Sequence, residues 1–162
     1  MMSETWESKA KDLIEKGHYE KASHIFEQAI EAEPEQVSHY WYLGVTYLLQ
    51  GKEEDAQATW LWGLFEVSQE ASSDQSTEEL ATLLEKTAQK QAKQANWANA
   101  ELIRRHLREL DPENINNILE LLQLSLERGT FQKADLEEWQ VESILSQTSQ
   151  EHINLPLLRF VI

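Results

Sequence analysis

Apolar residues recur with helical spacing along most of the chain. Trp6, Leu13 and Ile14 share one helical face near the start, and the same spacing continues over 22–30. No stretch shows the sustained alternation that a half-buried strand requires. The segments are rich in Ala, Glu, Gln, Leu and Lys, which are strong helix formers. The pattern predicts an all-α chain of eight helices, at about 4–16, 19–33, 36–50, 53–69, 77–94, 97–110, 113–128 and 133–147.

The joints between these segments carry signals of their own. Gly17 and Gly51 stand where a helix must end and reverse, which suits a residue that is free to adopt a positive φ. The Asp-Pro pair at 111–112 combines a capping residue with one that fits a first helical turn. Residues 76–79 (Ser-Thr-Glu-Glu) read as a capping box that opens the fifth helix. We therefore expect the main linker at 71–76.

The sequence also repeats itself with a period of 34 residues. Units that start at Ser3 and Val37 place small and large apolar residues at the same signature positions, and such a period is typical of helical repeat proteins. The signature residues are Gly17, Tyr19, Ala22, Phe26, Ala29 and Pro34 in the first unit, and Leu43, Gly44, Tyr47, Gly51, Ala56, Trp60 and Gly63 in the second. A degenerate third unit at 81–114 follows a ten-residue insertion at 71–80, and a fourth, weaker unit covers 115–148.

These positions resemble those of the tetratricopeptide repeat, and Trp41-Tyr42-Leu43-Gly44 opens the clearest copy. The resemblance implies a single domain folded as a right-handed superhelix of about four antiparallel helix pairs. Its repeats would lie at about 3–36, 37–70, 81–114 and 115–148. A short C-terminal element at 151–162 would follow. This element ends on Phe-Val-Ile, an apolar tip that either packs on the fourth repeat or marks the front of a longer protein.

The chain is strongly acidic, and its charge is unevenly distributed along the sequence. The chain carries 29 acidic and 14 basic residues, a net charge of −15. Residues 1–70 hold 14 acidic and 5 basic residues, whereas 81–114 hold 6 basic and 5 acidic residues and form a basic island. Such acidity argues against a nucleic-acid partner, because phosphates would be repelled. No apolar run approaches the ~20 residues of a membrane span. The absence of cysteine is typical of a reducing compartment such as the cytoplasm.

No residue pattern in the chain points to catalysis. None of the five histidines belongs to an HExxH-type pair, and the glycine-rich phosphate loops and the GxSxG nucleophile motif are absent. The many carboxylates are typical of solvated helix faces. We expect no catalytic residue, no metal site and no cofactor, and the sequence predicts a non-catalytic scaffold for protein–protein interaction.

In tetratricopeptide folds the first helix of each pair lines a concave groove, so the resemblance also implies a binding surface. Its positions in the first repeat include Glu7, Ser8, Lys11 and Ile14, and Ser38 begins those of the second. The residues best suited to hold a partner are Trp41, Tyr42, Val45, Leu48, Leu49, Lys86, Gln89 and Lys93. Aromatic residues are favoured interface anchors, and lysines attract acidic groups. This set predicts a groove for a protein or peptide with an apolar anchor and an acidic group. The alternative is that Trp41 and Tyr42 pack inside the superhelix.

Arg104, Arg105 and Arg108 form the second part of the basic island, on the sixth predicted helix. One interpretation pairs them with neighbours such as Glu101 and Asp111. The other makes them a docking patch for an acidic partner. A second copy of this acidic chain is one such partner, which leaves weak self-association open.

A further resemblance concerns longer phrases. Residues 39–44 (His-Tyr-Trp-Tyr-Leu-Gly), 56–60 (Ala-Gln-Ala-Thr-Trp), 103–109 and 112–117 are similar to the amino-terminal region of cyanobacterial tetratricopeptide proteins. In that group the region precedes a glycosyltransferase domain of the O-linked N-acetylglucosamine transferase (SPINDLY-like) kind, or a methyltransferase domain. The resemblance implies an alternative function, in which this chain is the substrate-recognition region of a larger enzyme.

Overall fold

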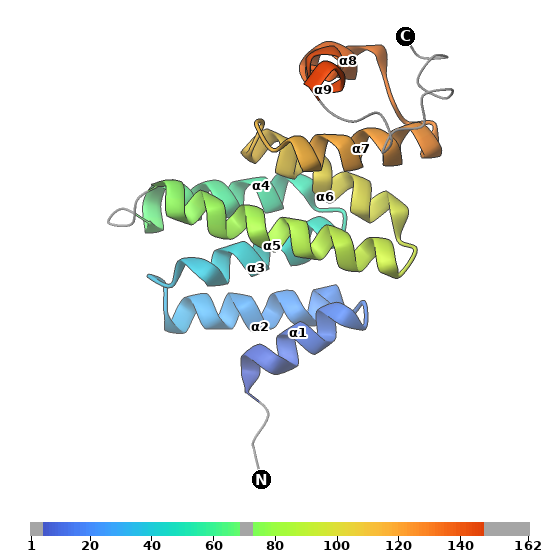
Figure 1. The fold of residues 1–162 in the computed structure, drawn as a ribbon. Helices are drawn as coiled ribbons and strands as arrows, with labels where there is room; N and C mark the ends of the chain where they lie inside the picture. Colours follow the sequence, from blue (N-terminus) through green and yellow to red (C-terminus); the bar gives the residue numbers. More distant parts are fainter. Residues whose placement is uncertain (1–4, 69–72, 148–162) are drawn as a thin grey trace. The chain divides into compact units, whose positions relative to one another are not determined.

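The computed structural model describes residues 5–68 and 73–147 of the chain. Within these ranges the secondary structure is helical, with no strand, as the sequence predicted. The elements, labelled in Figure 1, are α1 (Trp6–Glu15), α2 (Tyr19–Ala32), α3 (Val37–Leu49), α4 (Glu53–Trp62), the π-helix η1 (Gly63–Val67), α5 (Ser73–Lys93), α6 (Trp97–Leu110), α7 (Ile115–Arg128), α8 (Lys133–Glu138) and α9 (Val141–Gln147).

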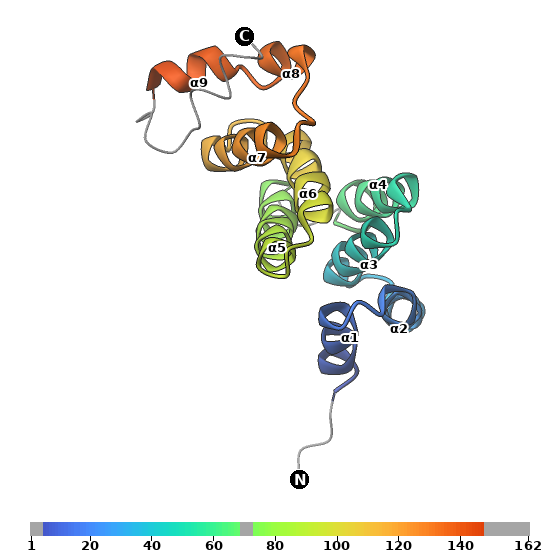
Figure 2. The same ribbon diagram turned by 90° about the vertical axis from the view of Figure 1, so that its right-hand side faces the viewer.

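The chain divides into two compact units, Met1–Leu83 and Leu84–Ile162, and the boundary falls inside α5. In the first unit α1 packs on α2, α2 on α3, and α3 on α4 and η1. Figure 2 shows α1 beside α2 and α3 beside α4 in this unit. One part of its core joins Ala10, Phe26 and Leu43, each from a different helix. The first unit is thus built from consecutive helices that bury their apolar faces against each other.

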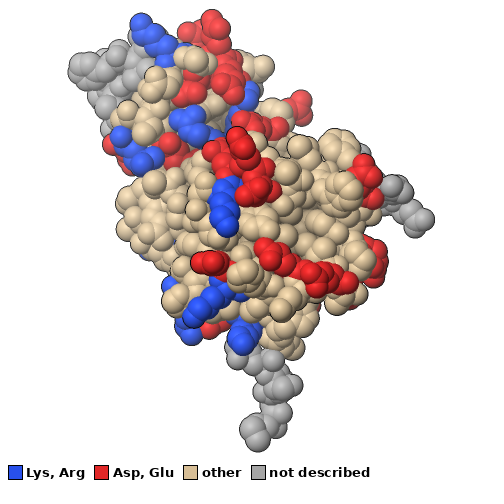
Figure 3. Space-filling model, turned by 180° about the vertical axis from the view of Figure 1, so that it is seen from behind, with Lys and Arg blue, Asp and Glu red and all other residues tan. Residues whose placement is uncertain are grey.

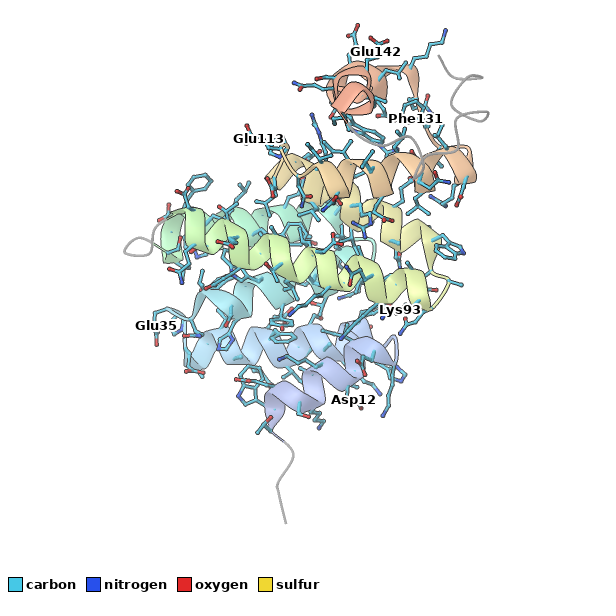
Figure 4. All side chains as sticks on the ribbon, viewed as in Figure 1. Asp12, Glu35, Lys93, Glu113, Phe131 and Glu142 are labelled. Carbon is cyan, nitrogen blue, oxygen red and sulfur yellow. The ribbon has the colours of Figure 1, made fainter. Side chains whose placement is uncertain are left out.

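In the second unit α6 packs on α7, and α8 packs on α9. The core of its last part is formed by Ile118, Leu121, Leu122, Leu126, Phe131, Trp139, Val141 and Ile144. Phe131, labelled in Figure 4, lies in the connection between α7 and α8 and packs at 5.6 Å from the ring of Trp139. The connection therefore contributes to the core as well as reversing the chain.

Four helix ends share the same geometry. A residue one or two positions past the last helical residue has a positive φ in each, at Gly17, Gly51, Ala95 and Gly129. The next amide donates to the carbonyl five residues earlier, as in a Schellman motif. These bonds join His18 to Leu13, Lys52 to Tyr47, Asn96 to Gln91 and Thr130 to Ser125. The left-handed positions are separated by 34, 44 and 34 residues, so the helix ends follow the period of the sequence with ten extra residues in the middle.

The expected linker and insertion differ from the structure. Residues 73–80 belong to α5, so most of the ten extra residues lengthen this helix instead of forming a separate segment. Ser76, predicted to cap the start of the helix, lies inside it and is buried. Burial of Ser76 and Leu80 on one face explains why the helix begins earlier than its polar sequence suggested.

The eighth predicted helix, 133–147, is wrong as a single element, because it is broken into α8 and α9 at Gln140, which has a φ of 51°. Trp139 and Val141 flank the break and are both buried, with exposed fractions of 3% and 1%. Residues two apart on a continuous helix do not face the same side. The break lets both side chains enter one core. The predicted element at 151–162 lies outside the described residues.

Candidate functional site

A pocket of about 270 Å³ opens in the first unit. Helix α1, the middle of α2, the connection after α2 and the start of α3 all contribute to its lining. The lining residues are Trp6, Glu7, Lys11, Phe26, Glu33, Gln36, Ser38, His39 and Tyr42. Side chains from elements that are separate in sequence therefore converge on one cavity, as in most binding sites.

Aromatic rings form much of the pocket wall. The rings of Phe26 and Tyr42 are stacked, with centroids 5.3 Å apart and planes 10° from parallel. Trp6 meets Phe26 edge-on at 6.0 Å and the His39 ring edge-on at 5.2 Å. These offset and edge-to-face arrangements are the ones that aromatic rings favour. The wall is consequently fixed by contacts between α1, α2 and α3.

Charged groups stand among these rings. The Lys11 ammonium lies 5.2 Å from the centroid of the Tyr42 ring, within the range of a cation–π interaction. His39 is buried, with 5% of its surface exposed, and its Nε2 lies 3.3 Å from a carboxylate oxygen of Glu33. Glu7 adds a second exposed carboxylate to the lining. The pocket thus combines aromatic faces, two carboxylates and one lysine.

The repeat register places part of this lining. Glu7 and Lys11, like Ser38 and Tyr42, are four residues apart and share a helix face. All four stand at positions that the register assigned to the groove, and all four line the pocket. Sequence reasoning did not single out Trp6, Phe26, Glu33, Gln36 or His39 for binding. The best available signal was Trp6, a large aromatic residue in the first turn of α1.

The other predicted groove residues of α3 lie in the interior. Trp41, Val45, Leu48 and Leu49 are all buried, and the Trp41 side chain is 2% exposed. The Trp41 ring is so close to Gly63 that a Cβ added there would lie 2.7 Å from it. Internal packing, the alternative left open from the sequence, therefore describes Trp41. Tyr42 is the member of this set that lines the pocket.

Lys86, Gln89 and Lys93 lie on the part of α5 that belongs to the second unit, and all three are exposed. Lys93 projects from the C-terminal end of α5 (Figure 4). The Gln89 side-chain amide donates to Glu85 at 2.9 Å. These residues remain open to solvent, on a different unit from Tyr42.

The arginines of the predicted docking patch are largely paired by contacts within the second unit. The Arg104 guanidinium, 7% exposed, donates to both carboxylate oxygens of Glu85 at 2.8 and 3.2 Å and to Asn117 at 3.0 Å. Burial alone would raise the pKa of Glu85. The hydrogen bonds and positive charge of Arg104, aided by Gln89, outweigh that effect and lower it. Arg104 is therefore a structural residue.

Arg105 and Arg108 are also bound internally. Arg105 lies 3.4 Å from Glu101 and 3.6 Å from Asp135, and its guanidinium stacks 5.0 Å from the Trp139 ring. Arg108 binds the carboxylate of Glu138 at 3.0 Å. The docking-patch interpretation is corrected by these contacts, because they occupy the charge that an acidic partner would need. Pairing within the unit describes all three arginines. The neighbour named from the sequence, Glu101, is a partner of Arg105, whereas Arg104 and Arg108 pair with Glu85 and Glu138 on other helices.

An apolar surface that the sequence did not single out lies at the end of α4 and in η1. Leu61, Trp62 and Phe65 are exposed by 52%, 57% and 71%. Short π-helical turns occur frequently at functional sites. The turn here carries Phe65, and the same element supplies Gly63 to the packing of Trp41.

Within the described segments, no group of three or more His, Asp or Glu side chains could hold a metal ion. No described helix combines the length and the apolar character needed to cross a membrane. Figure 3 shows acidic side chains in several separate groups on the face turned away from the viewer in Figure 1. A comparison of the chain with known protein families and with curated proteins finds no match.

Proposed function

We propose that this chain is a non-catalytic protein-interaction domain that binds a peptide segment of a partner protein through the pocket between α1 and α3. The single observation that carries the proposal is this aromatic-walled cavity, in which four of the nine lining residues stand at positions that the repeat register assigns to the groove. Trp and Tyr side chains dominate the energetics of many interfaces because they bury a large area at a low entropic cost.

The fold in this proposal is a tetratricopeptide-like right-handed superhelix of about four helix pairs. Its support is the recurrence of the same helix ending at Gly17, Gly51, Ala95 and Gly129. The connection after α2 and that after α6 also match: Glu33 and Asp111 have φ values of −137° and −134°, and each precedes a proline. Repeated geometry of this kind suits a stack of similar units.

The size of the pocket favours a side chain as the ligand. Drug-sized ligands occupy cavities of roughly 300–1,000 Å³, and this pocket has about 270 Å³. One large side chain of a peptide fits such a volume. The same property suits the alternative function, in which the chain selects protein substrates for a glycosyltransferase or methyltransferase domain. The lack of cysteine fits either role in the cytoplasm.

The expectation of an acidic group on the partner rests on Lys86 and Lys93. Both lysines are exposed. Self-association through the arginine patch is not part of this proposal, because Arg104, Arg105 and Arg108 are paired within their own unit. The pocket is therefore the stronger basis for a partner, and its own charges are the better guide to the ligand.

The test is a selection from a random peptide library on the immobilised full chain, repeated with two variants. Ser38→Trp places a large ring at a lining position, whereas Gln28→Trp places the same ring at an exposed position of α2 outside the lining. We expect peptides that bind the native chain and Gln28→Trp but not Ser38→Trp, with unchanged helix content by circular dichroism. Peptides that bind Ser38→Trp equally well would remove the pocket from the proposal.

A further inference from the structure

One of the residues that line the pocket, Lys11, carries a positive charge. Lys11 is exposed, yet its ammonium lies 5.2 Å from the Tyr42 ring centroid instead of extending into solvent. The Tyr42 ring is also stacked on Phe26. It therefore has one aromatic neighbour and one positive charge over its ring, and aromatic faces attract such a charge through their quadrupole.

The carboxylates of the lining point to the same kind of ligand. Glu7 and Glu33 both line the pocket, and 55% of the Glu33 side chain is exposed. With Lys11 as the one lysine or arginine in the lining, the acidic groups outnumber the basic ones. In the sequence, residues 1–70 include 14 acidic and 5 basic residues. The local field therefore attracts cations and repels an acidic ligand.

We infer that the pocket receives the side chain of an arginine or lysine from a basic segment of a partner protein, with Tyr42 and Trp6 as its aromatic faces and Glu7 and Glu33 as its counter-charges. This inference rests on the proposed function. A guanidinium stacks well on aromatic rings and binds carboxylates, so arginine fits the site better than lysine. The acidic group expected from Lys86 and Lys93 would then contact a different region.

Lys11 is the internal competitor in this arrangement. An incoming cation must displace its ammonium from the Tyr42 face, so the interaction that holds Lys11 weakens the binding of the partner. Removing Lys11 frees the ring face and takes one positive charge away from a lining that also holds Glu7 and Glu33. The same change would weaken the binding of an acidic ligand, because it removes the positive charge in the lining. The direction of the Lys11 effect therefore identifies the charge of the ligand.

The experiment titrates the full chain with three synthetic pentapeptides, acetyl-Gly-Ser-Xaa-Ser-Gly-amide, in which Xaa is arginine, norleucine or glutamate. Binding is followed by the NMR signals of the Trp6 indole and the Tyr42 amide at low salt and millimolar peptide. We expect the arginine peptide to shift these signals, with less effect from norleucine and none from glutamate. Lys11→Ala should tighten binding of the arginine peptide by about threefold, the amount that an exposed cation–π contact supports.

Two matched controls separate the pocket from general charge. Lys9→Ala removes the same charge from the same helix outside the lining, and should leave the affinity close to that of the native chain. The double variant Glu7→Gln with Glu33→Gln should bind the arginine peptide more weakly, by about threefold or more. Glu31→Gln with Glu35→Gln removes two exposed charges outside the lining and should have a smaller effect.

The possible failures are distinguishable. If the glutamate or norleucine peptide binds at least as tightly as the arginine peptide, the cation inference is overturned while the pocket remains a peptide site. The same conclusion follows if Lys11→Ala weakens the binding of the arginine peptide. If no peptide shifts the Trp6 indole at millimolar concentration, the inference fails, and a library selection insensitive to Ser38→Trp would show that the proposed function fails with it.

Discussion

The indole N–H of Trp60 on α4 donates a hydrogen bond to the backbone carbonyl oxygen of Trp41 on α3, 3.1 Å away. Each tryptophan also lies against a glycine of the other segment, Trp60 over Gly44 and Trp41 over Gly63. In both helices the tryptophan precedes the glycine by three residues. The two segments are thus packed by a reciprocal arrangement in which each glycine makes room for the opposing ring.

The first prediction concerns Gly44. Replacing a glycine within a helix by alanine usually stabilises a protein by up to about 1 kcal/mol. Here a Cβ would lie 2.0 Å from Nε1 of Trp60, so the ring must move and its hydrogen bond to Trp41 must break. We expect Gly44→Ala to destabilise the protein by about 1–3 kcal/mol in urea unfolding, as overpacking does. An increase in stability would contradict the packing described for Trp60.

The second prediction separates Trp41 from the binding pocket. Because Trp41 is buried against Gly63, Trp41→Ala should lower the free energy of unfolding by about 3–5 kcal/mol. Trp41→Phe keeps part of the ring and should lose less stability. Since Trp41 does not line the pocket, Trp41→Phe should leave peptide affinity unchanged. A variant that folds normally but loses binding would return Trp41 to the list of binding residues.

The contrast between Trp41 and Tyr42 shows what the sequence could predict. Helical spacing and the period of 34 placed most helices within a few residues, because these signals are local. Neighbouring residues of a helix point about 100° apart, so only one of two adjacent aromatic residues can face a given surface. Trp41 is the buried one, and its ring packs against Gly63, which begins a π-helix that the sequence did not predict.

The arginines show the same limit of sequence-based prediction for contacts between residues that are far apart in the sequence. The sequence offered neighbours such as Glu101 as partners, and Arg105 does lie 3.4 Å from Glu101. The main partner of Arg104 is Glu85, which is 19 residues away on another helix. The partner of Arg108 is Glu138, 30 residues away. Pairing between helices depends on tertiary packing, which an inspection of charges on one helix does not supply.

The third prediction follows from the helix end at Ala95. This residue has a φ of 61°, whereas the three equivalent positions are glycines. A left-handed conformation costs an L-residue such as alanine roughly 1–2 kcal/mol, and glycine avoids this cost but has greater freedom when unfolded. We expect Ala95→Gly to stabilise the protein by about 0.5 kcal/mol, measured by urea unfolding.

The matched variant is Gly51→Ala. A Cβ at Gly51 would meet no atom within 4 Å, so its effect isolates the backbone conformation. We expect Gly51→Ala to destabilise the protein by an amount similar to the gain from Ala95→Gly. Opposite signs in the two variants would support equivalent helix ends in both units, and equal signs would argue against it.

The fourth prediction uses the lowered pKa of Glu85. The unfolded chain protonates this carboxyl near its ordinary pKa of 4.5, whereas the folded chain holds it ionised to lower pH. The stabilisation by Arg104 is therefore fully present above pH 4.5 and is lost as the pH falls through the lower, folded pKa. Glu85→Gln should cost about 1–2 kcal/mol at neutral pH, a modest value because 35% of the Glu85 side chain is exposed.

The test compares the unfolding free energies of the native chain and Glu85→Gln from neutral pH to well below pH 4.5. We expect the difference between them to shrink on acidification, because the protonated carboxyl and the amide carry the same charge. Glu79→Gln, at an exposed position of the same helix, corrects for the general effect of removing one negative charge from an acidic protein. A difference that stays constant across the titration would mean that the charge of Glu85 adds nothing to its hydrogen bonds with Arg104.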